Sequence, residues 1–179
     1  MHYNRLYDRL ARDPALGELR DGDTRCFLMR PDTFMDAFGR LDEDARYTMF
    51  ATFAQSVARH SGQSPAKPYR DELGPAAREI FLNAAVNIAA DLGWGAWRFG
   101  PHNPGEMNLE VRDSPFAKGA ASGATTGDEA PQRCPACAPI LCLLEALGGI
   151  VFTVDPECTE TECAAGTGGD ICRFAARLG

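Results

Sequence analysis

The chain has 179 residues, a length that suits one domain with a buried core. Its hydrophobic content of 45% and charged content of 24% are those of a globular protein, and no apolar run approaches the roughly 18 residues of a membrane helix. With 25 acidic and 18 basic residues the formal net charge is -7, so the surface repels phosphate groups. We therefore expect no nucleic-acid binding by this chain alone and no membrane partner.

The cysteine content indicates a cellular compartment. The sequence has seven cysteines, an odd number, and its first residues contain no apolar signal core. Disulfide frameworks belong to secreted proteins, whereas thiol and metal chemistry belongs to reducing compartments. We therefore expect a cytoplasmic protein whose cysteines act as thiols or as metal ligands.

The N-terminal part of the chain is predicted to form a helix and a strand. Apolar residues from Tyr3 to Leu10 recur at helical spacing. Residues 1–24 are therefore expected to form an N-terminal helix and its lead-in, followed by a ligand-binding domain over residues 25–179. The segment Thr24 to Arg30 favours a strand, with Cys26 as one of its core residues.

Three helices are predicted next. The first begins at Asp32 or Thr33, and the second begins after an acidic segment and ends near Gly62. The third has Pro75 in its first turn, where a proline is well tolerated. Its buried face is predicted to consist of Ile80, Phe81, Ala84, Ala85, Ile88 and Leu92.

A β-hairpin with an aromatic cluster is expected after the third helix. The strand Trp94 to Phe99 is followed by a Gly/Pro-rich turn, and then Met107, Leu109 and Val111 alternate with polar residues. The aromatic side chains of this region form either the wall of a pocket for a flat apolar ligand or plain core. The candidate ligand-binding residues are Phe81, Trp94, Trp97, Phe99 and Phe116.

The remaining segments complete the predicted fold. Lys118 to Arg133 lacks periodicity and is expected to be a flexible loop that acts as a lid. A helix from Ala138 should stop at Gly148-Gly149, with strands at Ile150 to Val154 and Cys172 to Arg177. This element order predicts an α+β (α/β) fold, a mostly antiparallel sheet packed with helices.

The tail of the sequence has metal-ligand character. Cys163 and Cys172 flank a Gly-rich turn, Cys137 lies at the start of the late helix, and Glu160 is three residues before Cys163. Three thiolates and one carboxylate make a four-coordinate set that suits tetrahedral Zn²⁺. Because all four positions are filled by protein donors, such a site would be structural rather than catalytic.

Other interpretations of these cysteines remain open. Cys134 and Cys137 form a CxxC pair, so Cys134 could replace Glu160 and give an all-thiolate site. A redox CxxC normally opens a helix after a strand, and no strand is predicted before this pair. The cysteines could also be small buried hydrophobic residues without any metal.

Several segments resemble the 4-vinyl reductase domain family, also called the predicted hydrocarbon-binding family. The tail Glu160-Thr-Glu-Cys163 with Cys172-Arg-Phe174 resembles its C-terminal signature, and Leu92-Gly-Trp-Gly95 and Arg112-Asp-Ser-Pro-Phe116 resemble recurring inner segments. The resemblance spans residues 25–177. Members of this family include aromatic-sensing N-terminal domains of phenol- and xylene-responsive activators and a small bacteriochlorophyll-biosynthesis protein.

The resemblance implies a fold, a metal and a mode of assembly. The wider superfamily contains ligand-binding domains of nitric-oxide signalling and Golgi trafficking, often dimeric through N-terminal helices. In the phenol sensors a zinc ion is held at positions that match Cys137, Glu160, Cys163 and Cys172. This chain has one residue more than the family pattern between its last two cysteines, in the segment Ala164 to Ile171, so a bulged turn or an altered metal site is expected.

Taken with the residues, the resemblance implies a zinc-stabilised cytoplasmic domain that binds a small apolar or aromatic molecule, with a tetrapyrrole precursor among the candidates. One alternative is an enzyme or accessory subunit of bacteriochlorophyll or tetrapyrrole metabolism. However, the sequence has no dinucleotide fingerprint, flavin motif or iron–sulfur cysteine run, so it favours a protein that is not an enzyme. Another alternative is a dimeric scaffold without a ligand.

Overall fold

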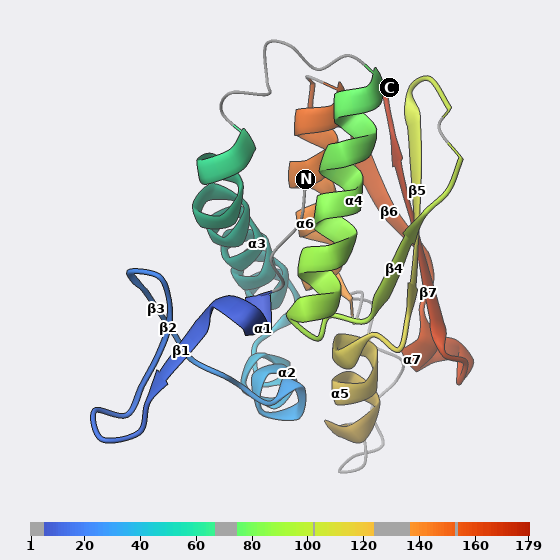
Figure 1. The fold of residues 1–179 in the computed structure, drawn as a ribbon. Helices are drawn as coiled ribbons and strands as arrows, with labels where there is room; N and C mark the ends of the chain where they lie inside the picture. The colour runs from blue at the N-terminus through green and yellow to red at the C-terminus, as the bar shows by residue number, and fades with distance from the viewer. Residues whose placement is uncertain (1–5, 67–74, 102, 124–136, 153) are drawn as a thin grey trace.

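The computed structural model describes residues 6–66, 75–101, 103–123, 137–152 and 154–179. In these residues, helices cover one face of a four-stranded antiparallel sheet, and a smaller three-stranded sheet extends away from them (Figure 1). This arrangement confirms the predicted α+β fold with an antiparallel sheet. Within the same residues, no helix combines the length and the apolar character needed to cross a membrane.

The main sheet has the order β4-β5-β7-β6. Its strands are β4 (Ala96–Phe99), β5 (Glu106–Arg112), β6 (Glu157–Glu162) and β7 (Ile171–Arg177). On β5 the side chains of Met107, Leu109 and Val111 are buried, as their alternation with polar residues predicts. The opposite face of the sheet carries cross-strand ion pairs of Glu110 with Arg98 and Arg173.

A β-bulge in β6 changes the direction of its side chains. Glu160 lies opposite the buried Phe174, whereas Glu162 lies opposite the exposed Arg173 and forms an ion pair with it. Residues directly opposite each other share a face of the sheet, so Glu160 faces the core and Glu162 faces outward. In a regular strand these two residues would share a face; the bulge separates them.

The late helix α6 (Ala138–Phe152) is longer than predicted. It continues through Gly148 and Gly149, so the predicted stop and the predicted strand at 150–154 are both wrong. A Cβ on Gly148 would lie 2.5 Å from Cγ of the buried Pro156. The glycine therefore permits close packing of the helix against the following segment, and it does not act as a helix stop.

Three helices occupy the region where the sequence predicts them: α2 (Pro31–Gly39), α3 (Glu43–Ala66) and α4 (Pro75–Asp91). The buried face predicted for α4 is wrong at its ends, because Ile80 is 65% exposed and Leu92 is 46% exposed. Ala89 is instead one of the buried residues of this helix. Helix α3 packs on α6 and contributes the fully buried Phe50.

The N-terminal part differs from the prediction. A short helix α1 (Leu6–Arg9) is followed by an antiparallel meander of β1 (Leu10–Asp13), β2 (Glu18–Asp21) and β3 (Thr24–Cys26), which projects from the molecule (Figure 1). The predicted strand therefore ends at Cys26 rather than at Arg30. Cys26 is half-buried and lies outside the core cluster, so its predicted core position is wrong.

The segment predicted as a flexible loop begins as a helix. Residues Pro115–Gly123 form α5, so the prediction is wrong for residues 118–123, and residues 124–133 lie outside the described residues. Ser114 accepts a hydrogen bond from the amide of Ala117, which caps the first turn of α5, and Pro115 follows at the first helical position. Start signals thus override the weak periodicity of this segment.

Candidate metal centre

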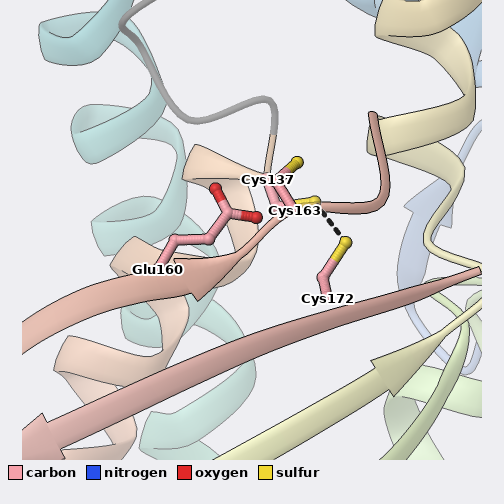
Figure 2. Close-up of side chains that lie close together, drawn as sticks. All are labelled: Cys137, Glu160, Cys163 and Cys172. Carbon is pink, nitrogen blue, oxygen red and sulfur yellow. Dashed lines mark hydrogen bonds between the residues drawn. The ribbon is translucent and has the colours of Figure 1, made fainter. Parts of the chain in front are cut away.

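Four predicted ligands come together at one end of the main sheet (Figure 2). Cys137 lies immediately before α6, Glu160 lies on β6, Cys163 lies between β6 and the short helix α7 (Ala164–Thr167), and Cys172 lies on β7. Their ligand atoms all lie within 4.8 Å of one another. Cys137 and Cys172, the first and the last of the four residues in the sequence, are fully buried.

The local backbone fixes each cysteine. The carbonyl of Cys137 accepts hydrogen bonds from the amides of Ile140 and Leu141, which begin α6. The carbonyl of Cys163 accepts hydrogen bonds from Gly166 and Thr167, which form the α7 turn. The bulge after Glu160 shifts the side-chain alternation of the residues that follow it. Glu160 and Cys163 therefore reach the same point although they are an odd number of residues apart.

The spacing of the donor atoms suits a tetrahedral metal ion. Sγ of Cys137 lies 3.4 Å from Sγ of Cys172, the contact drawn as a dashed line in Figure 2. A zinc ion with Zn–S distances of about 2.3 Å separates its sulfur ligands by roughly 3.8 Å, from tetrahedral geometry. These residues can therefore hold a metal ion with only small side-chain movements.

The acidic groups of the cluster perturb one another. Burial, together with the neighbouring Cys163, raises the pKa of Glu160 to about 8. Hydrogen bonds with Cys163 and Cys172 raise the pKa of Cys137, whereas the hydrogen bond from Cys137 lowers the pKa of Cys172. A bound cation would stabilise this group of buried acidic side chains, because it favours the ionised form of each of them.

One buried polar atom in the cluster indicates whether these residues fit a metal ion. Oε1 of Glu160 is buried and has no hydrogen-bond partner among the described residues. An unsatisfied buried carboxylate oxygen is costly, and a coordinated cation satisfies it. Three soft thiol donors with one carboxylate oxygen also match the ligand preferences of zinc. On both counts the residues present fit a zinc ion.

Two polar groups outside the four-residue set are within hydrogen-bond distance of the sulfur atoms. Oγ of Ser114 lies 3.2 Å from Sγ of Cys137, and the amide of Ala164 donates to Sγ of Cys172 at 3.3 Å. Donors of this kind orient thiolate ligands and reduce their charge. Ser114 was not among the predicted site residues, and the only signal at this position is that a serine directly before a proline favours a helix start.

The remaining cysteines have different surroundings. The alternative ligand Cys134 lies outside the described residues. Cys142 is buried on α6, and Cys158 is half-buried on β6. Burial raises the pKa of Cys158 to about 12, with further contributions from Glu145 and Cys142. Cys158 is therefore a protonated thiol at neutral pH and is not part of the candidate centre.

The additional residue between the last two cysteines is accommodated in the α7 turn. Gly168 adopts the left-handed conformation, with φ of 70°, and its amide donates to the carbonyl of Ala164, which ends α7. The chain then returns into β7 with Cys172 still in the cluster. The longer turn therefore leaves all four donor atoms together.

The aromatic candidates lie around α5 and the start of β4. Trp94 and Phe116 are in edge-to-face contact, with ring centroids 5.2 Å apart. Trp97 is buried and donates its indole N–H to the carbonyl of Trp94. Phe81 and Phe99 are half-buried and pack against the core.

Two aromatic residues that were not predicted for the pocket also lie against Trp94 and Phe116. Phe53 stacks on Trp94 with ring centroids 6.3 Å apart, and Phe34 lies 6.0 Å from Phe116. Both residues lie on helices whose apolar spacing predicts an inward face. That spacing is the sequence feature that could have placed them in this group. We call Phe34, Phe53, Trp94 and Phe116 the aromatic cluster.

The geometry defines an α+β domain with a buried set of three thiols and one carboxylate. In fold, the chain is similar to the phenol-responsive sensory domain of the transcription activator PoxR, solved with phenol. The TM-score is 0.70 at 17% sequence identity, and the match covers 96% of this chain and 86% of that one. The fold that the family resemblance implied is therefore confirmed.

Two other solved structures match with a TM-score of 0.40 each. One is a trafficking protein particle complex subunit 3 from Naegleria fowleri covalently bound to palmitic acid, at 16% identity over 83% of this chain and 80% of that one. The other is a vinyl-4-reductase family protein from Methanocaldococcus jannaschii, at 14% identity over 85% of this chain and 96% of that one. No family model and no curated protein matches the sequence.

Proposed function

We propose that this protein is a zinc-stabilised binding domain for a small aromatic or apolar molecule. The observation that carries the proposal is the buried set of Cys137, Glu160, Cys163 and Cys172 in a chain with the fold of a phenol-responsive sensory domain. The presence of four protein donors supports a structural role for the ion, since no coordination position is left for water or a substrate. We place the protein in the cytoplasm, where such thiols stay reduced.

The zinc would stabilise the end of the main sheet. When bound, it supplies a compact positive charge that neutralises the buried acidic donors. Cys137 fixes the start of α6, Glu160 and Cys163 fix the end of β6, and Cys172 fixes the start of β7. The ion thereby joins three segments that are separate in sequence, and binding energy becomes folding energy.

The ligand would bind among aromatic side chains. The proposed contacts are the predicted residues Phe81, Trp94, Trp97, Phe99 and Phe116, of which Trp94 and Phe116 belong to the aromatic cluster. Burying apolar ligand surface stabilises a complex by about 25 cal/mol per Å2, before the costs of ordering. The PoxR domain binds phenol in its solved complex, which makes phenols the first ligands to test.

The first experiment measures metal content. Protein purified without a metal-affinity step should contain one zinc per chain, with at least three of its thiols protected from titration in the native state. A metal-free protein with all its thiols reactive would contradict the zinc proposal.

The second experiment measures ligand binding. The melting temperature of the zinc-loaded protein should rise on saturation with a phenol or with a vinyl-tetrapyrrole, the two candidate ligand classes. An unchanged melting temperature with both would contradict the binding role. Turnover of the vinyl-tetrapyrrole in the presence of a reductant would instead establish an enzyme of tetrapyrrole metabolism.

We also propose that the protein forms a homodimer through its N-terminal meander. Phe27 and Leu28, directly after β3, are 77% and 86% exposed, and Met29 is 53% exposed. Three consecutive exposed apolar side chains beside the open edge of a small sheet favour association with a second copy of the chain. The double variant F27S/L28S should be monomeric by light scattering, whereas V154S, at another exposed apolar position, should behave as the wild type.

A further inference from the structure

The junction between β5 and α5 lies between the candidate metal centre and the aromatic cluster. Within a few residues it contains Ser114, which contacts Cys137, and Phe116, which contacts Trp94. In the fold, α5 packs against α2 on one side and against α7 on the other (Figure 1). The two sites are thus connected through one short helix.

The backbone of this junction has a fixed conformation. Asp113 has a φ of 56°, in the left-handed region that non-glycine residues rarely adopt. Its amide donates to the carbonyl of Asp170 at 2.9 Å, and its carboxylate forms an ion pair with Lys118 at 2.7 Å. A residue held in such a conformation needs support from its surroundings, and this pattern occurs often at functional sites.

A close backbone approach supports the same junction from the residue just before β4. A Cβ on Gly95 would lie 2.6 Å from the carbonyl oxygen of Arg112 and 3.0 Å from Cγ1 of Val111. Gly95 also has a φ of 95°, which side chains disfavour. The glycine after Trp94 therefore packs directly on the end of β5, two residues before Ser114.

Ser114 itself is buried and has two partners. It is 1% exposed, its Oγ accepts the amide of Ala117 at 3.4 Å, and the same atom lies 3.2 Å from Sγ of Cys137. A thiolate that binds a metal has no proton and can only accept a hydrogen bond. With the ion bound, the hydroxyl of Ser114 must therefore be the donor to Cys137.

Phe116 transmits the position of α5 to the aromatic cluster. Its ring contacts Trp94 at 5.2 Å and Phe34 at 6.0 Å. Helix α5 has little room to move against α2, because a Cβ on Gly119 would lie 3.0 Å from Cγ of Met35 and 3.1 Å from the carbonyl oxygen of Pro31. A change in the first turn of α5 therefore alters the ring contacts of Phe116.

We infer that Ser114 is a positioning residue: it donates a hydrogen bond to metal-bound Cys137 and thereby couples the metal centre to the aromatic cluster through Phe116. The inference rests on the proposed zinc-stabilised binding function. It extends that function, because ligand binding at the aromatic cluster then depends on the state of a metal that the ligand does not touch. By linkage, the ligand also strengthens metal binding by the same factor.

The experiment uses two variants without the hydroxyl group, Ser114→Ala and Ser114→Gly. Glycine is a good residue at a helix N-terminus whereas alanine is a poor one, so the pair separates the capping role from the contact with Cys137. The matched control is Ser56→Ala, at an exposed serine of α3. Each protein is loaded with Co²⁺, and the thiolate-to-cobalt absorption band and the metal affinity are measured.

Both hydroxyl-free variants should bind the metal about 10- to 100-fold more weakly than the wild type, the usual effect of removing a supporting hydrogen bond. Their charge-transfer band should shift to lower energy, because the sulfur of Cys137 becomes more electron-rich. Ser56→Ala should match the wild type in both measurements. If Ser114 only caps α5, Ser114→Gly will also keep the wild-type spectrum and affinity, and the inference is wrong.

The coupling is measured with phenol as the probe, followed by the fluorescence of Trp94 and Trp97. In the wild type, removing zinc should weaken phenol binding and change the fluorescence of the free protein. In the two variants this effect of zinc should be reduced or lost. An equal effect of zinc in the wild type and in both variants would overturn the inference.

Hydrogen exchange in the wild type provides a test without a substitution. Removing zinc should increase amide exchange over residues 114–123 and leave the meander, residues 10–26, unchanged. Unchanged exchange over residues 114–123 would contradict the coupling. A wild-type protein that binds no metal would refute the proposed function itself, an outcome distinct from failure of the Ser114 variants alone.

Discussion

At the scale of single residues, the tail cysteines differ in what surrounds their sulfur atoms. Cys137, Cys163 and Cys172 point toward a shared centre with Glu160. The hydroxyl group of Ser114 contacts Sγ of Cys137, and the amide of Ala164 donates to Sγ of Cys172. Cys158 has no place in this set and packs against the core. The same residue type therefore serves as a candidate ligand at three positions and as a small apolar residue at another.

The first prediction compares two cysteine substitutions. Cys163→Ser should lower the free energy of unfolding by about 3 kcal/mol or more, because the loss of a ligand removes metal-binding energy from the folded state. Cys158→Ser should cost less than about 1 kcal/mol by comparison, since a serine can replace a small half-buried thiol. Chemical denaturation of both variants measures this. Equal losses would contradict the ligand assignment.

The second prediction concerns thiol reactivity. Because burial raises the pKa of Cys158 to about 12, its reactive thiolate form is scarce at pH 8. We expect Cys158 to be alkylated far more slowly in the native protein than after unfolding, with a rate that rises about tenfold per pH unit. Pulsed alkylation followed by peptide mass spectrometry measures this rate. Rapid native alkylation at pH 8 would show that the thiol is accessible and ionised.

Much of the candidate site could be predicted at this scale. The donor set followed from residue types and spacing, since soft thiolates near a carboxylate suit zinc. The serine that contacts Cys137 could not be predicted, because Ser114 is distant in sequence from every donor and only the β5–α5 junction brings it there. Most of the aromatic candidates were predicted together because they are close in sequence. Phe34 and Phe53 were not predicted, because they lie on helices that are distant in sequence.

At the scale of elements, glycine has different meanings in different contexts. The Gly148-Gly149 pair predicted a helix stop, but α6 continues because Gly148 packs on Pro156 and because the helix is buried on several sides. Similarly, the Ala- and Gly-rich segment after Phe116 forms a helix, and Gly119 allows that helix to pack closely against α2. Local sequence signals cannot distinguish a glycine that ends a helix from one that permits close packing.

The third prediction uses the two glycines of α6 as a matched pair. Gly148→Ala should destabilise the protein by about 1 to 2 kcal/mol, because overpacking against Pro156 outweighs the better helix propensity of alanine. Gly149→Ala should be neutral or stabilising by up to about 1 kcal/mol, since its Cβ meets only the carboxylate of the exposed Asp155 at 3.1 Å. Thermal unfolding of the two variants tests this, and the opposite ranking would disprove the packing argument.

At the scale of the whole molecule, the antiparallel sheet and its helical cover were predictable and the N-terminal meander was not. The alternation of Met107, Leu109 and Val111 indicates a strand with one buried face, which the structure bears out. The strands β1 and β2 lack such alternation because neither face is fully buried. A sheet that projects from the molecule leaves little hydrophobic pattern in the sequence.

The fourth prediction concerns removal of the metal. Since the proposed zinc joins α6, β6 and β7, a strong chelator should lower the stability of the molecule by about 3 kcal/mol or more. For a domain of this size that corresponds to a fall in melting temperature of roughly 6 to 12 °C. Calorimetry with and without chelator measures the shift, and added zinc should restore the original value. No change would mean that the four donors do not hold a structural ion.

The order of the strands also has a consequence for how the protein folds during its synthesis. β7 is the last of the four strands to leave the ribosome, yet it lies between β5 and β6 in the finished sheet. Until it emerges, β6 has no partner in the sheet and β5 is paired along one edge only, with β4. The nascent chain therefore exposes unpaired strand edges until β7 emerges, and such edges are prone to aggregation.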